Sequence, residues 1–345
     1  MQAVILAGGK GTRLRPLTLH TPKPIVPVVN RPFLLYQMDL LKPAGIRSVI
    51  LCLSYQPRKI EELLGDGSEF GMHISYLVEA LPLGTAGALK NAQQQLEGTT
   101  VVFNGDILTD VDIADVIKQH RTTGAAATIV VTPIDNPIGL GVVEMADDRR
   151  VTRFVEKPQR QEVHSNLINA GIYVLQPSVL KLIPEHRSFS FEYDFFPSLL
   201  EAGEPFYAYR HDGYWLDIGT PEGYRRGNLD VLNQRLSTYE VQFPPAGEKF
   251  DPTCSVENSY VDPSCVIKPQ AQIINSIIGA NCFIEEKARI ENSVIWAASR
   301  IGAEAQLRGS VVGKGCHIGQ LAVIDGAVLG DKSAVTDYSQ LEQRR

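Results

Sequence analysis

The C-terminal part of the sequence repeats a pattern every 17 residues, and this repeat restricts the possible folds more than any other feature. Between residues 254 and 337, fourteen large aliphatic residues follow one another at steps of six, six and five positions. A small residue stands two positions before every one of them. The aliphatic residues are Val261, Ile267, Ile273, Ile278, Ile284, Ile290, Ile295, Ile301, Leu307, Val312, Ile318, Ile324, Leu329 and Val335.

This periodicity predicts a triangular parallel β-helix, because each coil then has three short flat faces with one aliphatic side chain pointing inward from each. The pattern resembles the hexapeptide-repeat family of left-handed β-helices. Three of the five cysteines, Cys265, Cys282 and Cys316, fall in one column of small residues. We interpret them as buried fillers, because a metal site needs paired short spacings such as CxxC, which are absent, and a reducing compartment disfavours disulfides.

The N-terminal part has a different pattern, in which short apolar strands alternate with amphipathic helices. This alternation predicts an α/β fold with a mixed, mostly parallel sheet covered by helices. Strands are expected at residues 2–7, 48–53, 73–78, 100–103 and 126–131, and helices at 32–42, 85–95 and 112–123. Together the two patterns predict an α/β domain at residues 1–237, a linker at 238–253, a β-helix at 254–337 and a polar tail at 338–345.

The charge and hydrophobic pattern limit the partners and the compartment. A formal net charge of −6 gives no reason to expect nucleic acid or an anionic membrane as a partner. No apolar run approaches the roughly 18 residues that span a bilayer, and the N-terminal MQAVILAGG lacks the basic segment of a signal peptide. We therefore expect a cytoplasmic protein whose positive charge toward anionic substrates is local.

A glycine-rich, cationic turn follows the first predicted strand. Gly8, Gly9 and Gly11 allow backbone N–H groups to face an anion without obstruction by Cβ atoms. The turn is not a P-loop, because Lys10 precedes Gly11, and it is not a dinucleotide fingerprint, because Leu14 replaces the third glycine. Its cations are Lys10, Arg13, Arg15 and Lys23.

Several separated motifs accompany this turn in a fixed order between Met1 and about Leu236. They are GGKGTRLRPLT with PKP, LGTAGAL, FNGD, FVEKP, NAGIYVL and YWLDIGTPEGY. Together they resemble the sugar nucleotidyltransferase family, also called NDP-sugar pyrophosphorylases, and most closely its mannose-1-phosphate guanylyltransferases. The resemblance implies a Rossmann-like nucleotidyltransferase domain and an enzyme that joins a nucleoside triphosphate to a sugar-1-phosphate and releases pyrophosphate. Long members of this family also carry a C-terminal left-handed β-helix.

The resemblance implies that two distant carboxylates, Asp106 and Asp217, bind Mg²⁺ as the cofactor. This metal prefers one or two protein carboxylates and takes its other ligands from water and phosphate oxygens. Arg13 is expected to hold the phosphates that leave as pyrophosphate, and Lys23 to neutralise charge at the α-phosphorus during in-line attack. Both are predicted catalytic residues, and no covalent nucleophile is expected.

The nucleotide is expected to contact the glycine turn and the LGTAGAL motif. Family members that select uracil or thymine carry Gln five residues before the glycine of that motif, whereas this chain has Glu79, five residues before Gly84. A carboxylate accepts both donors of the guanine pairing edge and donates nothing to uracil, so GTP is predicted. The predicted nucleotide-binding residues are Leu6, Ala7, Gly8, Gly9, Gly11, Thr12, Glu79, Gly84 and Thr85.

The sugar phosphate, predicted to be mannose-1-phosphate, is expected to contact Gly141, Glu156, Lys157 and Asn169, which match the family's motifs. One departure is Leu140, because members often carry Tyr there, and this leaves a side-chain contact at that point in doubt. A glucose-1-phosphate thymidylyltransferase and a non-catalytic regulatory homologue are the alternatives. His317 is the only histidine of the predicted β-helix, so acyl transfer is not expected there. We expect the β-helix to serve assembly into a homo-oligomer.

Overall fold

The structure is a computed structural model that describes residues 1–342. It contains two compact units. The first comprises residues 1–10 and 34–215, and the second comprises residues 11–33 together with the chain from Leu216 onward. In this division residues 11–33 group with the β-helix, whereas the sequence analysis assigns them to the domain at residues 1–237. Among the described residues, no helix has the length and apolar character needed to cross a bilayer.

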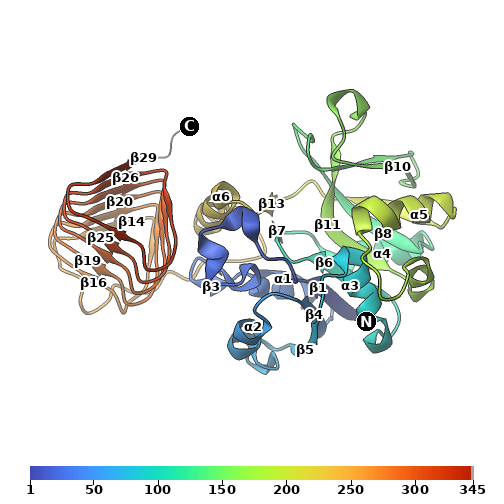
Figure 1. The fold of residues 1–345 in the computed structure, drawn as a ribbon, viewed down its shortest axis with the longest axis horizontal. Coiled ribbons are helices and arrows are strands. Elements are labelled where there is room, and N and C mark those ends of the chain that lie inside the picture. The colour runs from blue at the N-terminus through green and yellow to red at the C-terminus, as the bar shows by residue number, and fades with distance from the viewer. Residues whose placement is uncertain (343–345) are drawn as a thin grey trace. The chain divides into compact units, whose positions relative to one another are not determined.

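The first unit is built on a nine-stranded mixed sheet (Figure 1). Its main strand order is β10-β9-β11-β6-β1-β4-β5, and β8 pairs with both β11 and β12. Strands β6, β1, β4 and β5 are parallel to one another, whereas β11 runs antiparallel to β6, β8 and β9, which confirms a mixed sheet. Its strands are β1 (Gln2–Leu6), β4 (Ser48–Leu53), β5 (His73–Val78), β6 (Thr100–Asn104), β8 (Ala127–Pro133), β9 (Gly141–Met145), β10 (Val151–Glu156), β11 (Leu167–Leu175) and β12 (Phe206–Arg210).

The central strand β1 shows why these segments become strands. Its residues Ala3, Val4 and Ile5 are all fully buried, which is the continuous apolar run expected of a parallel strand covered on both faces. The three predicted helices are present as α1 (Leu34–Leu41), α3 (Gly84–Ala92) and α4 (Ile113–Thr122), and Asp112 caps α4 by accepting from the N–H groups of Ala114 and Asp115. Two helices were not predicted, α2 (Pro57–Leu64) and α5 (Phe196–Glu201).

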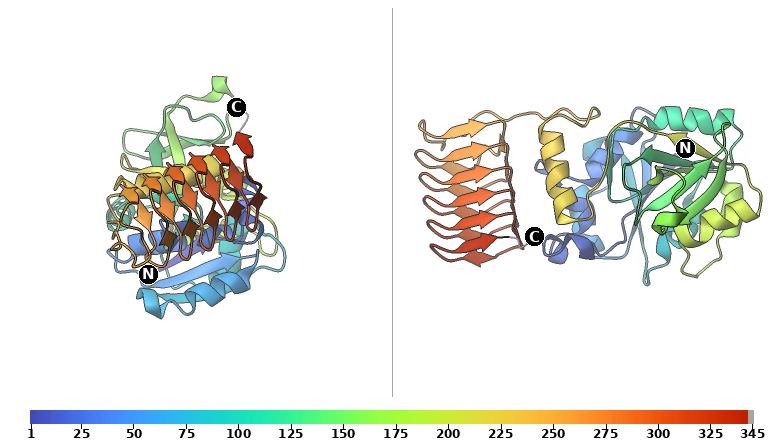
Figure 2. Two further views of the ribbon diagram at one scale, coloured as in Figure 1. Left: turned by 90° about the vertical axis from the view of Figure 1, so that its left-hand side faces the viewer. Right: turned by 90° about the horizontal axis from the view of Figure 1, so that it is seen from above.

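The second unit contains the predicted left-handed β-helix, whose coils stack into three all-parallel sheets (Figure 2). Each residue pairs with the residue 17 positions later, as Ile273 does with Ile290. All fourteen predicted inward aliphatic residues are buried in its core except Leu329, which is partly buried. The strands are β14 (Ser255–Glu257), β15 (Tyr260–Val261), β16 (Val266–Ile267), β17 (Gln272–Ile274), β18 (Ile277–Ile278), β19 (Phe283–Ile284), β20 (Arg289–Glu291), β21 (Val294–Ile295), β22 (Arg300–Ile301), β23 (Gln306–Arg308), β24 (Val311–Val312), β25 (His317–Ile318), β26 (Val323–Asp325), β27 (Val328–Leu329), β28 (Ala334–Val335) and β29 (Gln340–Glu342).

The columns of small residues have two uses. In one column the serine hydroxyls accept backbone N–H groups from the next coil, for example Ser276 N–H to Ser259 Oγ at 3.0 Å and Ser293 N–H to Ser276 Oγ at 3.1 Å. In another column Cys265, Cys282 and Cys316 are buried free thiols, which confirms their interpretation as fillers.

The predicted polar tail at residues 338–345 is wrong for its described part. Strand β29 pairs with β26, with Leu341 beside Ile324, so the β-helix continues to Glu342. Ser339 and Leu341 extend the rule of a small residue two positions before an aliphatic one, but the charged and amide residues around them hide it in the sequence. Residues 343–345 lie outside the described residues.

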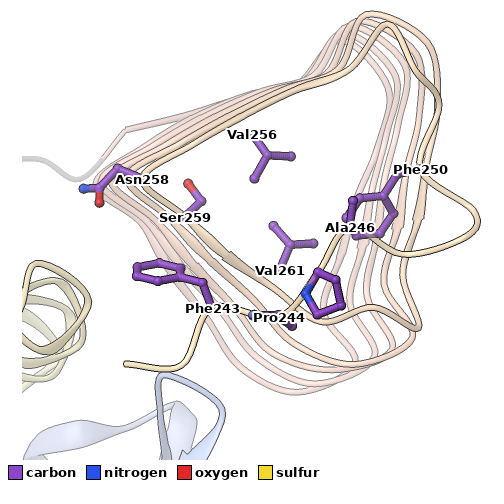
Figure 3. A pocket seen from close by; sticks show the side chains of 9 residues that line it. Phe243, Pro244, Ala246, Phe250, Val256, Asn258, Ser259 and Val261 are labelled. Carbon is purple, nitrogen blue, oxygen red and sulfur yellow. The ribbon is translucent and has the colours of Figure 1, made fainter. Parts of the chain in front are cut away.

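The linker covers the open end of the β-helix. Phe243, Ala246 and Phe250 of the linker, together with Val256 and Val261 of the first coil, line an open hollow of about 450 Å³ (Figure 3). Phe250 also forms a β-bridge with Ile267. The apolar end of the stack is therefore partly capped by the chain itself, which repeat proteins require at their ends. Just before the linker, α6 (Pro221–Leu232) lies alongside the β-helix, with Thr220 as its N-cap (Figure 2).

Candidate active site

The glycine turn begins at the carboxyl end of β1 in the first unit. Ala7 donates its N–H to Cys52 O on β4, and Ser54 Oγ donates to Gly8 O. A Cβ on Gly8 would lie 3.1 Å from Ser54 Oγ, whereas a Cβ on Gly9 would meet nothing within 4 Å. Hydrogen bonds to β4 and to Ser54 therefore hold the backbone of residues 6–9 in place, and the position of a Cβ on Gly9 is open.

The rest of the turn belongs to the second unit and is organised around Gly11. This residue has a φ of 61°, in the left-handed region that favours glycine, and its carbonyl accepts from Thr18 Oγ1 at 2.6 Å. A Cβ on Gly11 would lie 3.2 Å from Lys23 Cβ. Thr12 and Arg13 follow in a short 3₁₀ helix, Thr12–Leu14. Gly11 therefore allows the start of the turn to pack closely on Lys23.

Three predicted site residues, Arg13, Lys23 and Asp217, meet in the second unit. Both terminal nitrogens of Arg13 lie 3.1 Å from Asp217 Oδ2, and Lys23 Nζ lies 4.0 Å from Asp217 Oδ1. Lys23 is 8% exposed, which is rare for a lysine and indicates a fixed position. Two cations share one carboxylate here, so this cluster carries a net positive charge toward an anion.

Gly219 completes this cluster and was not predicted from the sequence. Its N–H donates to Asp217 Oδ1 at 2.6 Å. A Cβ on Gly219 would lie 2.6 Å from Asp217 Oδ1, 2.7 Å from Arg13 Nη2 and 2.9 Å from Lys23 Nζ. Glycine is therefore required for all three charged ends to occupy these positions at once. The WLDIG motif contains this residue, but the motif alone does not indicate what the glycine contacts.

The other predicted metal ligand, Asp106, lies in the first unit at the end of β6. Gly105 donates its N–H to Leu6 O at 3.0 Å, and a Cβ on Gly105 would lie 2.7 Å from that oxygen. Gly105 therefore brings Asp106 close to the carboxyl end of β1, where the glycine turn starts. Asp217 belongs to the second unit, so a metal ion shared by the two aspartates stays a prediction. Within residues 1–342 no group of three or more His, Cys, Asp or Glu side chains forms a metal site.

Glu79, the predicted reader of the base, has one carboxylate oxygen without a partner. Its Oε2 accepts from Leu83 N–H at 3.3 Å, whereas its Oε1 is buried and makes no hydrogen bond. Burial raises the pKa of this carboxyl, and the Leu83 N–H partly opposes that rise. An unpaired buried acceptor costs free energy unless a ligand donates to it. Glu79 Oε1 is therefore suited to receive an N–H donor.

The LGTAGAL motif packs against the segment that leads into a π-helical turn, Phe191–Phe195. A Cβ on Gly84 would lie 2.6 Å from Phe189 O, and Ala86 and Gly87 both donate their N–H groups to this oxygen. Thr85 Oγ1 accepts from Phe191 N–H at 2.8 Å. The first N–H groups of α3 are thus satisfied within the protein, so Gly84 and Thr85 have packing roles in addition to any contact with nucleotide.

The predicted sugar-phosphate residues Gly141, Glu156 and Lys157 gather where β9 and β10 pair. Gly141 lies opposite Glu156, and a Cβ on Gly141 would lie 2.8 Å from Glu156 Oε2. Lys157, with a φ of 49°, places its Nζ 3.9 Å from Glu156 Oε1 and donates its N–H to Leu140 O. Burial raises the pKa of Glu156, the charge of Glu192 raises it further, and Lys157 lowers it.

Asn169, on β11, is already engaged in a buried network. Its Oδ1 accepts from Gly171 N–H and its Nδ2 donates to Tyr173 Oη, each at 2.9 Å. Asn104 also donates to Tyr173 Oη, while Asn104 Oδ1 is buried and makes no hydrogen bond. Any contact between Asn169 and a sugar must therefore use the acceptor and donor capacity that remains after these bonds.

Glu192 is a second candidate that sequence reasoning missed. It lies in the π-helical turn, a rare element that occurs mostly at functional sites. Its Oε2 accepts from Ser190 Oγ at 2.7 Å and from Thr85 Oγ1 at 3.3 Å, and its charge acts on Glu156. Glu192 therefore connects the predicted nucleotide and sugar-phosphate sides of the first unit. No motif in the sequence identifies it.

Comparisons with known proteins match both parts of the chain. The nucleotidyl transferase family matches residues 2–234, and the GMPPB C-terminal domain matches residues 255–344. A mannose-1-phosphate guanylyltransferase of Mycobacterium tuberculosis is 42% identical over 234 residues, which are 67% of this chain but only 65% of that protein. A mannose-1-phosphate guanyltransferase of Eremothecium gossypii is 38% identical, and the catalytic subunit beta of Danio rerio is 41% identical. Each of these two alignments covers 77% of this chain and 73% of the relative.

Solved structures of similar fold include HddC from Yersinia pseudotuberculosis, with a TM-score of 0.58 and 32% identity over 66% of this chain and 97% of that one. A putative glucose-1-phosphate thymidylyltransferase from Bacillus anthracis, in complex with a sucrose, has a TM-score of 0.62 and 26% identity. It covers 71% of this chain and 98% of that one. Both likenesses support a sugar-nucleotidyltransferase fold.

Proposed function

Because the chain belongs to the nucleotidyl transferase family, we propose that it transfers a guanylyl group from GTP to mannose-1-phosphate and releases pyrophosphate. The observation that carries this proposal is the meeting of Arg13, Lys23 and Asp217 in the second unit. A phosphate oxygen of the sugar phosphate attacks the α-phosphorus of GTP in line, the bond from this phosphorus to the leaving oxygen breaks, and pyrophosphate departs. Both substrates are polyanions, so alignment and charge neutralisation supply most of the rate enhancement.

Arg13 and Lys23 provide the positive charge for this step. The Arg13 guanidinium presents two donors in one plane, which matches the oxygens of the departing pyrophosphate. The Lys23 ammonium is held in a buried position beside Asp217, where it acts on the α-phosphorus as negative charge builds up. Asp217 holds both cations in place before substrate binds.

Asp106 and Asp217 are the residues that would hold Mg²⁺. Their donor set fits this ion, because carboxylate oxygens are hard ligands and Mg²⁺ needs only one or two of them beside phosphate and water. When bound, the ion would neutralise charge on the phosphates. Mg²⁺ dependence remains part of the proposal.

The preference for guanine is supported by the unpaired Oε1 of Glu79. The guanine pairing edge offers the N1–H and the N2 amino group, and a carboxylate accepts from both. Uracil and thymine offer carbonyl oxygens in that region, which a carboxylate cannot satisfy. Relatives named mannose-1-phosphate guanylyltransferase support the same base and sugar. We further propose that the protein is cytoplasmic, forms homo-oligomers and binds neither nucleic acid nor membrane.

The test is a pyrophosphate-release assay over a grid of GTP, UTP, dTTP and ATP against mannose-, glucose- and heptose-1-phosphate, with Mg²⁺ and with EDTA. The highest kcat/KM is expected for GTP with mannose-1-phosphate, and EDTA should abolish the reaction. The highest rate with dTTP and glucose-1-phosphate would instead identify a thymidylyltransferase. Lack of turnover with every pair, together with measurable binding of a nucleotide sugar, would identify a regulatory homologue.

A further inference from the structure

One corner of the β-helix carries a column of five residues, three of which are glycine. The residue after every third inward aliphatic is Asp262, Gly279, Trp296, Gly313 and Gly330 in successive coils. A Cβ on Gly279 would lie 2.6 Å from Ala297 N, and a Cβ on Gly313 would lie 2.7 Å from Asp331 N, so the column is crowded. Trp296 stands between Gly279 and Gly313, so it places a large side chain where both neighbouring coils have none. Coil stacking alone does not explain this tryptophan.

Two hydrogen bonds, one buried and one partly buried, connect Trp296 with the segment that carries Lys23. The indole, 4% exposed, donates its Nε1–H to Tyr224 Oη on α6 at 2.8 Å. The two rings meet edge to face, with centroids 6.2 Å apart and an interplanar angle of 75°. Tyr224 is fully buried, and its hydroxyl donates in turn to Pro27 O. Pro27 stands four residues after Lys23, so the chain of contacts ends beside the predicted catalytic lysine.

Further contacts hold the same segment on both sides of Lys23. On the C-terminal side, Asn30 Nδ2 donates to Ile278 O of the β-helix at 3.0 Å, and Val29 N–H donates to Asn228 Oδ1 of α6 at 2.9 Å. On the N-terminal side, Pro16 packs on Gly330 so closely that a Cβ on this glycine would lie 3.0 Å from Pro16 Cβ. The β-helix therefore makes direct contacts with this segment on both sides of Lys23, at Pro16 and at Asn30.

All of these residues belong to the second unit, together with Arg13, Lys23 and Asp217. We propose that Trp296 is a positioning residue for nucleotidyl transfer, and that the β-helix acts through it and Tyr224 to hold Lys23 at the reacting phosphate. This goes beyond assembly, because it makes the C-terminal repeat part of the catalytic geometry. We call the two hydrogen bonds from Trp296 to Tyr224 and from Tyr224 to Pro27 the link. Removing one polar atom of the link should lower kcat without unfolding the protein, because the packing of the two rings remains.

The first test uses two full-length variants that each remove one polar group and keep a ring. Trp296→Phe removes the indole N–H, and Tyr224→Phe removes the hydroxyl between Trp296 and Pro27. Each should lower kcat for pyrophosphate release about tenfold, with the KM for nucleotide changed less than twofold, since a misplacement of about 1 Å can cost up to a hundredfold. The loss of kcat in the double variant should be no greater than the larger of the two single-variant losses, because both polar groups belong to one link.

The matched control is Ser293→Ala, in the same coil as Trp296. It removes the hydroxyl that accepts from Ser310 N–H and donates to Glu291 O, and both of these bonds lie within the β-helix. It should lower the unfolding temperature as much as Trp296→Phe does while leaving kcat unchanged. Equal kcat losses in Ser293→Ala and Trp296→Phe would overturn the proposal, because they would reveal a general effect of β-helix stability.

The second test asks whether Trp296 acts through Lys23. In a Lys23→Ala background, Trp296→Phe should cause no further loss of kcat, and a second tenfold loss would overturn the proposal. A parallel measurement does not rest on the proposed function: backbone hydrogen exchange of residues 24–30 should rise at least tenfold in Trp296→Phe, while exchange in β1 stays unchanged. If no substrate pair shows turnover, this exchange experiment alone decides the proposal, and unchanged exchange in residues 24–30 refutes it.

Discussion

Replacing Gly219 by alanine should separate catalysis from stability in this protein. The added Cβ would lie 2.6 Å from Asp217 Oδ1, 2.7 Å from Arg13 Nη2 and 2.9 Å from Lys23 Nζ. Ordinary contact begins at 3.4 Å, so these three ends must move by 0.8, 0.7 and 0.5 Å (3.4 minus each distance). Each is the end of a flexible side chain, and the φ of Gly219 lies outside the left-handed region, so the backbone does not have to shift.

These displacements approach 1 Å at the predicted catalytic groups, and a shift of that size costs up to about a hundredfold in rate. We therefore expect Gly219→Ala to lower kcat for pyrophosphate release ten- to a hundredfold, equivalent to about 1.4–2.7 kcal/mol in the activation barrier. The unfolding temperature should change by no more than a few degrees, because only side-chain ends have to move and a change of about 1 kcal/mol shifts the unfolding temperature by only a few degrees. Steady-state kinetics and calorimetry on the same sample measure both quantities.

Gly223→Ala is the contrasting variant, because its Cβ would lie 2.4 Å from the backbone oxygen of Asp217, which cannot swing away. It should lower the unfolding temperature clearly as well as the activity. A Gly219→Ala enzyme with wild-type kcat would refute the view that Arg13, Lys23 and Asp217 act from the positions seen here. A Gly219→Ala enzyme as unstable as Gly223→Ala would refute the view that only side-chain ends move.

Three further predictions concern the base, the sugar side and the β-helix. Glu79→Gln should shift the ratio of kcat/KM for GTP over UTP or dTTP about ten- to a hundredfold toward the pyrimidine nucleotides, and an unchanged ratio would exclude Glu79 as the reader of the base. Glu192→Gln removes a negative charge that raises the pKa of Glu156, so the pKa of Glu156 should fall and the acid limb of kcat/KM for the sugar phosphate should move to lower pH. A limb that stays in place would show that Glu156 does not have to be ionised. Ala298 has a φ of 61°, which strains a residue with a Cβ, so Ala298→Gly should raise the free energy of unfolding in urea by about 0.5 kcal/mol. A lower free energy of unfolding would contradict this account.

The β-helix could be predicted almost completely from the sequence, because a strict period leaves one solution for where each side chain points. The inward positions from Val261 to Val335 were correct, and the one error, the tail, arose where polar neighbours hide Ser339 and Leu341. The parallel part of the first sheet was also predictable from buried apolar runs such as that of β1. Helix α2 was missed because its eight residues carry only two buried positions, Ile60 and Leu64.

The candidate site was less accessible to sequence reasoning. Motifs identified Arg13, Lys23 and Asp217, which lie together, but motifs do not report contacts between distant segments. Gly219 has its role only because three charged ends surround it, and Glu192 has its role only because a π-helical turn brings it near Glu156. Because motifs do not report such contacts, the sequence analysis assigned residues 11–33 to the same domain as the strands before and after them, although they cluster with the β-helix.

The attachment of residues 11–33 to the β-helix limits how this protein can change in length. The contacts with Asn30, Tyr224 and Pro16 come from Ile278, Trp296 and Gly330, which lie in three different coils. Inserting or deleting one 17-residue coil between these points would displace at least one contact by a strand spacing of about 4.8 Å. Evolution or protein engineering can therefore lengthen the stack only outside the coils that run from Ile278 to Gly330, and the number of coils between these two points is set by the distance that residues 11–33 have to span.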